Sequence, residues 1–232
     1  MLTMTYAGKT SEEMGLKILS MPTRTRAAQR GNSLEVSGRH GDLWSSDGTL
    51  QPYDQPVRAS ARQSRLNGIM AWITGAGDLV FSDAPTLVIP ARADQEVRCT
   101  RVTNDSDPLY RVEFTFTCQP FFYVAPPAAD IEITASGTAL TNPYTMESMP
   151  RIKVFGNGDI TLNVGRHTVF LTEVQTAIVL DSELLDAFTA DETELANSQM
   201  DGAFPTLDPG AQYISWTGVV TKVVITPRWR CF

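Results

Sequence analysis

Histidine is scarce in this chain, with only His40 and His167 among 232 residues. Because histidine is the commonest general acid–base residue and a frequent zinc ligand, its scarcity argues against most Ser-His-Asp, acid–base and zinc chemistry. Cysteine is also rare: Cys99, Cys118 and Cys231 are odd in number, and their spacing matches no metal-binding knuckle. We therefore expect buried or incidental thiols, no cofactor, no metal site and no catalytic residues, so that the protein is not an enzyme.

Long hydrophobic runs are absent as well, and no stretch approaches the ~20 apolar residues that cross a bilayer. The first residues also lack the basic-then-apolar order of a secretory signal. Charged residues make up only 19% of the chain, whereas hydrophobic residues make up 42%, enough for a real core. We expect a folded protein without a membrane contact, which stays in the cytoplasm or leaves by a route other than secretion.

Charge is unevenly distributed along the chain. Residues 1–122 carry 13 basic and 13 acidic side chains, whereas residues 123–232 carry 6 and 13. The first half is therefore neutral, and the second half holds the whole net charge of −7. An acidic surface repels a phosphate backbone, which argues against specific nucleic-acid binding by the second half. The difference between the halves also suggests two domains.

The clearest strand signal lies at Leu109–Cys118, where apolar and polar residues alternate over ten positions. A turn-forming cluster at Asn104–Pro108 precedes it. The run Glu96–Thr103 before that turn is expected to form the other arm of a hairpin. Pro120 ends the pattern. Alternation of this kind is typical of a strand with one buried face.

One helix is expected in the first half. Its apolar stripe would consist of Leu66, Ile69, Met70 and Ile73, which fall at i, i+3, i+4 and i+7. Ser60 or Ser64 is positioned to cap its start, and the Gly75–Gly77 segment is expected to stop it. Strands are expected to resume after it, at Asp78–Ser82 and Thr86–Ala91.

A proline-containing segment, Ala125–Ala129, is the best candidate for a domain boundary, because its two prolines hold the backbone extended. Short strands separated by Gly, Pro and Asn turns follow it, as in a β-sandwich or barrel. These expected strands are Ile131–Thr134, Arg151–Phe155, Asp159–Val164, Val169–Thr172, Thr176–Leu180, Tyr213–Thr217 and Val219–Thr226. The sequence therefore predicts a mainly β protein with two domains.

One cluster combines glycines with polar and aromatic residues. It consists of Gly38, Arg39, His40, Gly41, Asp42, Leu43 and Trp44. His40 and Asp42 could form an acid–base pair, but no third catalytic member is near them in sequence. The alternative is a glycine-shaped turn whose Arg and Trp side chains pack against a neighbouring molecule. We expect the second, and we predict that this turn contributes to a contact between subunits.

Two further segments suggest ligands and have simpler explanations. Gly156–Asp159 resembles a phosphate-binding loop, but no Lys-Ser/Thr pair and no helix follow it, so a tight hairpin is expected. An acidic group between Asp181 and Glu194 could suggest Ca²⁺, but it lacks the loop spacing and central glycine of an EF-hand. We interpret it as a solvated acidic surface.

Several motifs, taken in order, resemble those of the distal tail proteins of siphophages. Their order along nearly the whole chain carries the resemblance more than any single motif. The matching segments are Ser11–Leu16, Gly38–Leu43 (like "G-R-x-G-x-L"), Trp72-Ile73 with Gly77–Asp83 (like "W-L … G-x-L-x-F-x-D"), Phe114–Phe121 (like "F-x-C-x-P-F"), Asn142-Pro143, Pro150–Ile152, Gly156–Asp159 and Phe204–Gly210 (like "F-P-x-L-x-P-G").

The resemblance implies a homo-oligomer, a ring of six copies at the tail tip of a virion, assembled in the bacterial host cytoplasm. Residues 1–124 would form the ring, and residues 125–232 would form a galectin-like β-sandwich that faces outward. The implied partners are the tail tube protein and a tail-associated baseplate or fibre protein, and the tape measure protein is a further candidate. The family has no known catalytic residues, so none are carried over. Enlarged members carry inserted carbohydrate-binding modules, for which 232 residues leave no room.

Two other functions stay open at this point. A carbohydrate-binding module that recognises the host surface could use Tyr213, Trp216 and Trp229 as stacking faces. A wall hydrolase would need paired carboxylates such as Asp181 and Glu183 beside a cleft, yet nothing in the sequence separates the environments of these two groups. A ring-forming hub with the Gly38–Trp44 turn at its interface is the preferred hypothesis.

Overall fold

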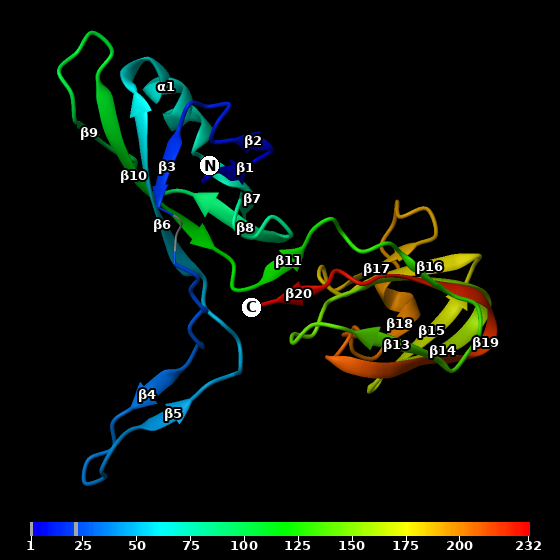
Figure 1. Ribbon diagram of the computed structural model, residues 1–232. Coiled ribbons are helices and arrows are strands. Elements are labelled where there is room, and N and C mark those ends of the chain that lie inside the picture. The colour runs from blue at the N-terminus through cyan, green and yellow to red at the C-terminus, as the bar shows by residue number, and fades with distance from the viewer. Residues whose placement is uncertain (1, 21–22) are drawn as a thin grey trace. The chain divides into compact units, whose positions relative to one another are not determined.

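The computed structural model describes residues 2–20 and 23–232 and divides into two compact units (Figure 1). Unit 1 runs to Phe122 and also includes Phe232, and unit 2 is Tyr123–Cys231. Both units are built mainly from antiparallel strands, so the mainly β fold class is confirmed. Among the described residues, no helix is long and apolar enough to cross a membrane.

Unit 1 is built on one large antiparallel sheet with the strand order β2-β1-β7-β8-β10-β6-β3, and β9 pairs with β10. A separate two-stranded sheet is formed by β4 and β5. The elements are β1 (Met4–Tyr6), β2 (Lys9–Thr10), β3 (Lys17–Ser20), β4 (Asn32–Leu34), β5 (Leu43–Ser45), β6 (Tyr53–Arg62), α1 (Gln63–Trp72), β7 (Gly75–Phe81), β8 (Leu87–Ala93), β9 (Arg98–Arg101) and β10 (Leu109–Cys118).

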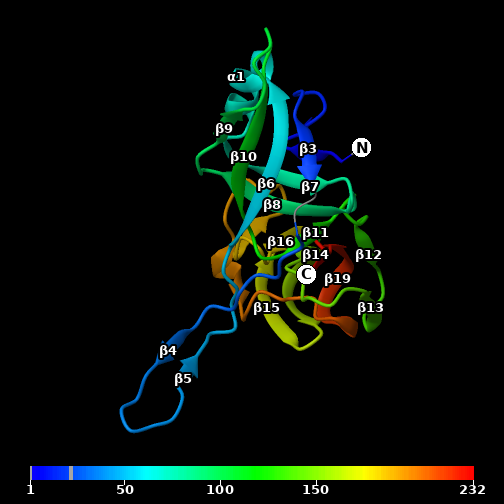
Figure 2. The same cartoon turned by 60° about the vertical axis from the view of Figure 1, so that its left-hand side comes forward.

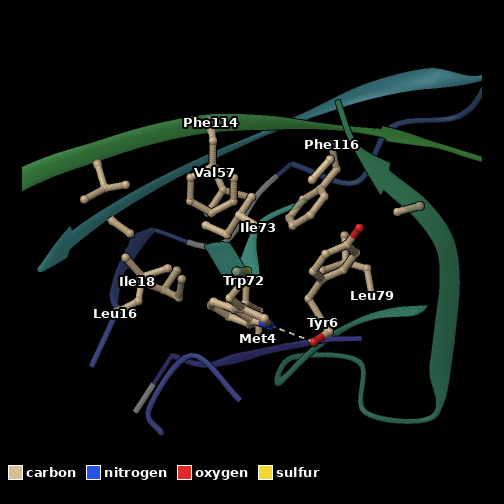
Figure 3. Packing of buried hydrophobic residues seen from close by; sticks show 14 of the residues in the cluster. Met4, Tyr6, Leu16, Ile18, Val57, Trp72, Ile73, Leu79, Phe114 and Phe116 are labelled. Carbon is tan, nitrogen blue, oxygen red and sulfur yellow. Dashed lines mark hydrogen bonds between the residues drawn. The ribbon is translucent and has the colours of Figure 1, made fainter. Parts of the chain in front are cut away.

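The longest ladder of unit 1 joins β6 and β10, which lie side by side in Figures 1 and 2 and pair over ten positions. The expected strand at Leu109–Cys118 is confirmed with the same bounds, and β9 is its expected hairpin partner. The alternating side chains of both strands enter one core (Figure 3). In that core the Trp72 indole donates a hydrogen bond to the Tyr6 carbonyl, 2.9 Å away.

The helix α1 forms where the apolar stripe predicted it, but two details differ. Its buried residues are Leu66, Ile69 and Trp72, whereas Met70 is 42% exposed. Neither expected serine caps its start: the carboxylate of Asp107, from the loop before β10, accepts hydrogen bonds from the Ser64 N–H and hydroxyl, at 3.0 and 3.1 Å. A residue 43 positions away therefore supplies the N-terminal acceptor, and no local pattern could have indicated it.

Unit 2 contains a second antiparallel sheet with the strand order β12-β19-β14-β15-β18. In the same sheet β13 pairs with β19, β16 pairs with β14, and β17 pairs with β16. Its elements, together with the junction strand β11, are β11 (Phe122–Val124), β12 (Ile131–Ile133), β13 (Thr138–Asn142), β14 (Arg151–Val164), β15 (His167–Val174), β16 (Ala177–Asp181), β17 (Asp186–Thr189), the 3-10 helix η1 (Asn197–Gln199), β18 (Met200–Asp201), β19 (Gly210–Thr226) and β20 (Arg230–Cys231).

The hairpin expected at Gly156–Asp159 is wrong, because β14 continues through it as a single strand of 14 residues. The expected division of β19 at Gly218 is wrong in the same way, since that strand runs over 17 residues. Both glycines sit at irregularities of the β14–β19 ladder. A Cβ on Gly156 would lie 2.3 Å from the Val219 carbonyl oxygen, and Gly218 has φ +96°. Glycine here permits a bulge and a close approach of two backbones, and it does not reverse the chain.

Candidate interaction surface

The β4–β5 hairpin, hereafter the arm, holds the turn that the sequence singled out. Its strands pair with each other and with no other strand of the described chain. Every residue from Asn32 to Thr49 is exposed. A two-stranded hairpin has little stability of its own in water, so a surface outside the described chain is needed to bury either of its faces.

Four large apolar side chains of the arm are exposed to solvent. Leu34 is 61% exposed, Val36 36%, Leu43 41% and Trp44 59%. Leu34 lies directly opposite Leu43 in the ladder, and directly opposite residues project from the same face, so these two form an apolar pair. Exposed apolar groups that gather on one small element are typical of a protein-binding surface.

Trp44 lies opposite Ser33, on the other face of the arm, and its ring packs against the backbone of Gly31. A Cβ on Gly31 would lie 2.3 Å from Trp44 Cζ2. Only glycine therefore leaves room for the indole in this position. The close contact orders the ring while 59% of the residue stays accessible, so Trp44 is presented to solvent in a defined orientation.

The tip of the arm is shaped by Gly38 and Gly41, whose φ angles are +82° and +73°. L-residues with side chains adopt this region at a cost, so both positions favour glycine. The predicted turn is therefore present. A His40–Asp42 acid–base pair was not expected and gains no support, since the hydrogen-bond partner of the Asp42 carboxylate is the Ser33 hydroxyl, which donates to it at 2.5 Å. His40 is exposed at the tip.

The arm is anchored in unit 1 at its base. Ala27 is buried in the core, and backbone hydrogen bonds of 2.8 Å join Arg30 to Thr49 and Gln51 to Ala28. Just before the arm, the Arg26 guanidinium lies over the Phe232 ring at 4.9 Å, a cation–π contact. The base is therefore closed by hydrogen bonds between its own two segments and packs into unit 1 through Ala27, whereas every residue from Asn32 to Thr49 is exposed.

The three thiols are dispersed. Cys118 is buried in the core of unit 1. Burial raises the pKa of its thiol, whereas a hydrogen bond with Tyr53 lowers it. Burial dominates and raises the pKa of the Cys118 thiol to about 12, so it stays a neutral thiol at physiological pH. Cys99 is half-buried on β9, and its pKa is raised by burial. No group of three or more His, Cys, Asp or Glu side chains that could hold a metal occurs among residues 2–20 and 23–232.

The two carboxylates considered for hydrolysis, Asp181 and Glu183, share one partner. Arg228 binds Asp181 through both nitrogens, and its Nη1 lies 3.2 Å from the second carboxylate. Burial disfavours the charged form of Asp181. The hydrogen bonds from Arg228 and from the Leu184 N–H outweigh it and lower the pKa of Asp181 below its usual value. An acid held ionised in this way is unsuited to donate a proton to a leaving group, so the arrangement is that of a structural ion pair.

The three aromatic residues considered for sugar stacking lie in different environments. Tyr213 is 66% exposed on β19, whereas Trp229 is buried at 8% and Trp216 packs partly against the core of unit 2. Sequence inspection did not single out Phe170, which is 50% exposed on β15. Phe170 lies between the buried residues Val169 and Leu171 of β15. This alternation was the sequence signal that could have indicated an exposed aromatic ring.

Comparison with known proteins identifies the fold. No family model and no curated protein matches the sequence. Among solved structures, the chain is similar to the SPP1 Dit (gp 19.1) protein, whose crystal structure is described as a paradigm of the hub adsorption apparatus in phages that infect Gram-positive bacteria. The match has a TM-score of 0.78 and 15% sequence identity, and it covers 97% of this chain and 98% of that one.

The match covers both units of the chain, so the whole fold is similar to that of the SPP1 Dit protein. The mainly β fold and its likeness to a distal tail protein are therefore confirmed, whereas the galectin-like character of residues 125–232 stays a prediction. Sequence identity of 15% leaves the residues of the two proteins largely different, and residue roles cannot be transferred between them.

Proposed function

We propose that this protein is a structural component of a phage tail tip, a hub that joins the tail tube to the adsorption apparatus. The observation that carries the proposal is the fold match over 97% of the chain to a protein described as a paradigm of the hub adsorption apparatus in phages. The exposed apolar side chains of the arm support it, because a protein that works by docking must present such a surface.

In this proposal six copies close into a ring through residues 1–124, and residues 125–232 form the galectin-like domain. Ring closure requires a heterologous interface, in which one patch meets a different patch on the next copy. The arm is suited to supply one of these patches, with Leu34, Leu43 and Trp44 as its apolar contacts. Residues 1–122 have no net charge, so repulsion between copies would not oppose their packing.

The ring would meet the tail tube protein on one side and a tail-associated baseplate or fibre protein on the other, with the tape measure protein as a further contact. The role is mechanical and involves no cofactor. The turn Gly38–Trp44 forms the tip of the arm and the start of β5. A neighbouring subunit that binds the arm would therefore also contact this turn.

The purified chain tests the proposal directly. We expect light scattering to give a mass about six times 25.5 kDa, either alone or with its tail partners, and negative-stain images to show rings. A strict monomer at high concentration, without rings even beside those partners, would contradict it.

A variant that carries both Leu34→Ser and Trp44→Ser tests the arm itself. Because both side chains are more than half exposed and lie outside the core of unit 1, we expect a change of about 1 kcal/mol or less in the monomer's free energy of unfolding, but loss of rings. Val219→Ser is the matched control, since Val219 is 65% exposed in unit 2. Rings that persist in the double variant would remove the arm from the interface and leave the hub proposal standing.

Carbohydrate binding is a second candidate function, favoured by one face of unit 2. Tyr213 on β19 and Phe170 on β15 are exposed, and the registers of β14 with both strands place Asn163 beside Ser215 and Thr168. Exposed aromatic rings and small polar groups on one sheet can stack on sugar rings and hydrogen-bond to their hydroxyls.

Isothermal titration with host wall polysaccharide separates the two functions. Millimolar or tighter binding by a monomer, lost in Tyr213→Ala, would favour the carbohydrate-binding module. Absence of heat with the polysaccharide, together with ring formation, would leave the hub as the function.

A further inference from the structure

Two adjacent leucines of unit 2 project into solvent from the hairpin between β16 and β17. Leu184 is 61% exposed and Leu185 is 62% exposed. They end the four-residue loop Ser182–Leu185 that connects the two strands. This element, hereafter the leucine tip, is separate in sequence from the arm and takes no part in the core of unit 2.

Leu185 occupies a backbone conformation that is unfavourable for leucine. Its φ is +59°, in the left-handed region that Gly or Asn adopts more readily. Of the six non-glycine residues with positive φ in the described chain, it is the one with a large exposed apolar side chain. The strain is not offset by burial in the core of unit 2. Such outliers gather at functional contacts, which points to a role outside the described chain.

The base of the leucine tip is held rigidly. Asp181 accepts hydrogen bonds from the backbone N–H groups of Glu183 and Leu184, at 3.1 and 3.2 Å, while Arg228 fixes its carboxylate from outside the loop. The Ser182 hydroxyl donates a hydrogen bond of 2.7 Å to the Pro205 carbonyl. Binding by a preorganised loop loses little conformational entropy, so these contacts favour a docking role.

The charge around the leucine tip selects the chemistry of the partner. The segment Asp181–Glu194 contains six carboxylates and no Lys or Arg. Asp181, Glu183 and Glu192 have basic partners within the chain. For Asp186, Asp191 and Glu194, no ion pair is found in the described part of the chain, so their charge is not neutralised.

We propose that the leucine tip is a docking element for a different protein, one that presents an apolar pocket rimmed by Lys and Arg side chains. Leu184 and Leu185 would fill the pocket, and Asp186, Asp191 and Glu194, for which the described residues supply no ion pair, would face its basic rim. A second copy of this chain is a poorer occupant, because its two halves carry net charges of 0 and −7 and neither is basic. The inference rests on the proposed function only in taking the partner from among the other tail proteins.

Photo-crosslinking in assembled tails tests the proposal. Leu184 is replaced by the photoreactive residue p-benzoyl-phenylalanine in the phage that encodes the chain, and purified tails are irradiated. We expect a covalent product with a different tail protein, at a peptide next to Lys or Arg. Products only between copies of this chain, or no product although the variant is present in tails, would overturn the docking proposal and leave the hub role intact.

The same tails test the proposed function separately. If the chain is absent from purified tails, the hub role fails, and the assignment of the partner to a tail protein fails with it. Rings formed by the purified chain without a crosslink at position 184 would contradict the leucine tip alone.

Leu185→Asn distinguishes docking from folding. Asparagine tolerates positive φ, so we expect an unchanged or higher melting temperature. In the same variant we expect the crosslink yield from position 184 to fall about tenfold, the effect of losing roughly 1.4 kcal/mol of contact. Val102→Asn, at a 55% exposed position in unit 1, should leave the yield unchanged. An unchanged yield in Leu185→Asn would overturn the proposal.

Discussion

Arg228 holds Asp181 through two parallel hydrogen bonds, from Nη1 to Oδ1 at 2.6 Å and from Nη2 to Oδ2 at 2.7 Å. The Asp181 side chain is 5% exposed and the Arg228 side chain 25%. A planar guanidinium matches a carboxylate in this bidentate geometry, and a lysine ammonium cannot reproduce it. The pair joins Asp181, the last residue of β16, to the segment that follows β19.

Removing the guanidinium should destabilise unit 2 strongly. Arg228→Ala leaves a buried carboxylate without its cation, and we expect the free energy of unfolding to fall by about 3 kcal/mol in urea denaturation. Arg228→Lys should recover only part of the loss. Lys222→Ala is the control: it removes an exposed ion pair with Glu132, for which we expect roughly 0.5 kcal/mol. Equal losses in the two alanine variants would contradict the assigned role of the pair.

Stability should depend on pH through the same carboxylate. Because its folded-state pKa is lowered, Asp181 contributes stability above its unfolded pKa of about 3.9, and this contribution is lost as the pH falls through the folded value. We therefore expect the wild-type protein to exceed Asp181→Asn in unfolding free energy at pH 7 and the difference to shrink below pH ~4. A difference that stays constant down to acid denaturation would show that the charge of Asp181 is not involved.

The capping of α1 from a distant loop can be measured with two neighbouring aspartates. Asp107→Ala removes the acceptor for the Ser64 N–H, and we expect a loss of about 1 kcal/mol in thermal or urea unfolding. Asp105→Ala, in the same loop, removes an ion pair with Arg62 whose side chains are both 51% exposed, and it should cost less than Asp107→Ala because solvent screens an exposed pair. A larger loss of stability in Asp105→Ala than in Asp107→Ala would mean that the ion pair with Arg62, and not the helix cap, holds the loop.

Two glycines should respond to alanine in opposite directions. In Gly156→Ala the new Cβ would lie 2.3 Å from the Val219 carbonyl oxygen, so we expect a loss of roughly 2 kcal/mol in unfolding free energy. Gly68 lies in α1, and the nearest atom to its added Cβ is Met14 Cε at 3.8 Å. Gly68→Ala should therefore stabilise the protein by about 0.5 kcal/mol or more. Destabilisation by both substitutions would indicate that the helix position is crowded as well.

The sequence predicted the elements whose signals are local. The strand Leu109–Cys118 was found with its bounds because large apolar residues alternate over its whole length. The partner strand β6 was not predicted, although it alternates equally well, because its inward positions include Gln55, Ala59 and Ala61 and carry little hydrophobic contrast.

The long strands of unit 2 could not be predicted from local patterns. The glycines of β14 carry the composition of a turn, and only the pairing of this segment with β15, β16 and β19 shows that the strand continues through them. For the candidate surface, the turn at Gly38–Trp44 was predicted from its glycines, and its role in a subunit contact stays a prediction. The sequence shows the leucine tip as two adjacent leucines in an acidic segment. Only the structure shows that both are exposed and that Leu185 has a positive φ.

The paired irregularities of β14 and β19 have a consequence for how this ladder aligns. Gly156 is opposite Val220, and the added Cβ of Gly218 would lie 2.4 Å from the Asp159 carbonyl oxygen, so each glycine admits the partner backbone at one place only. A slip of one residue would replace glycine with a side chain at both close approaches and would also turn the buried face outward. The two bulges therefore restrict β14 and β19, the longest strands in unit 2, to a single register.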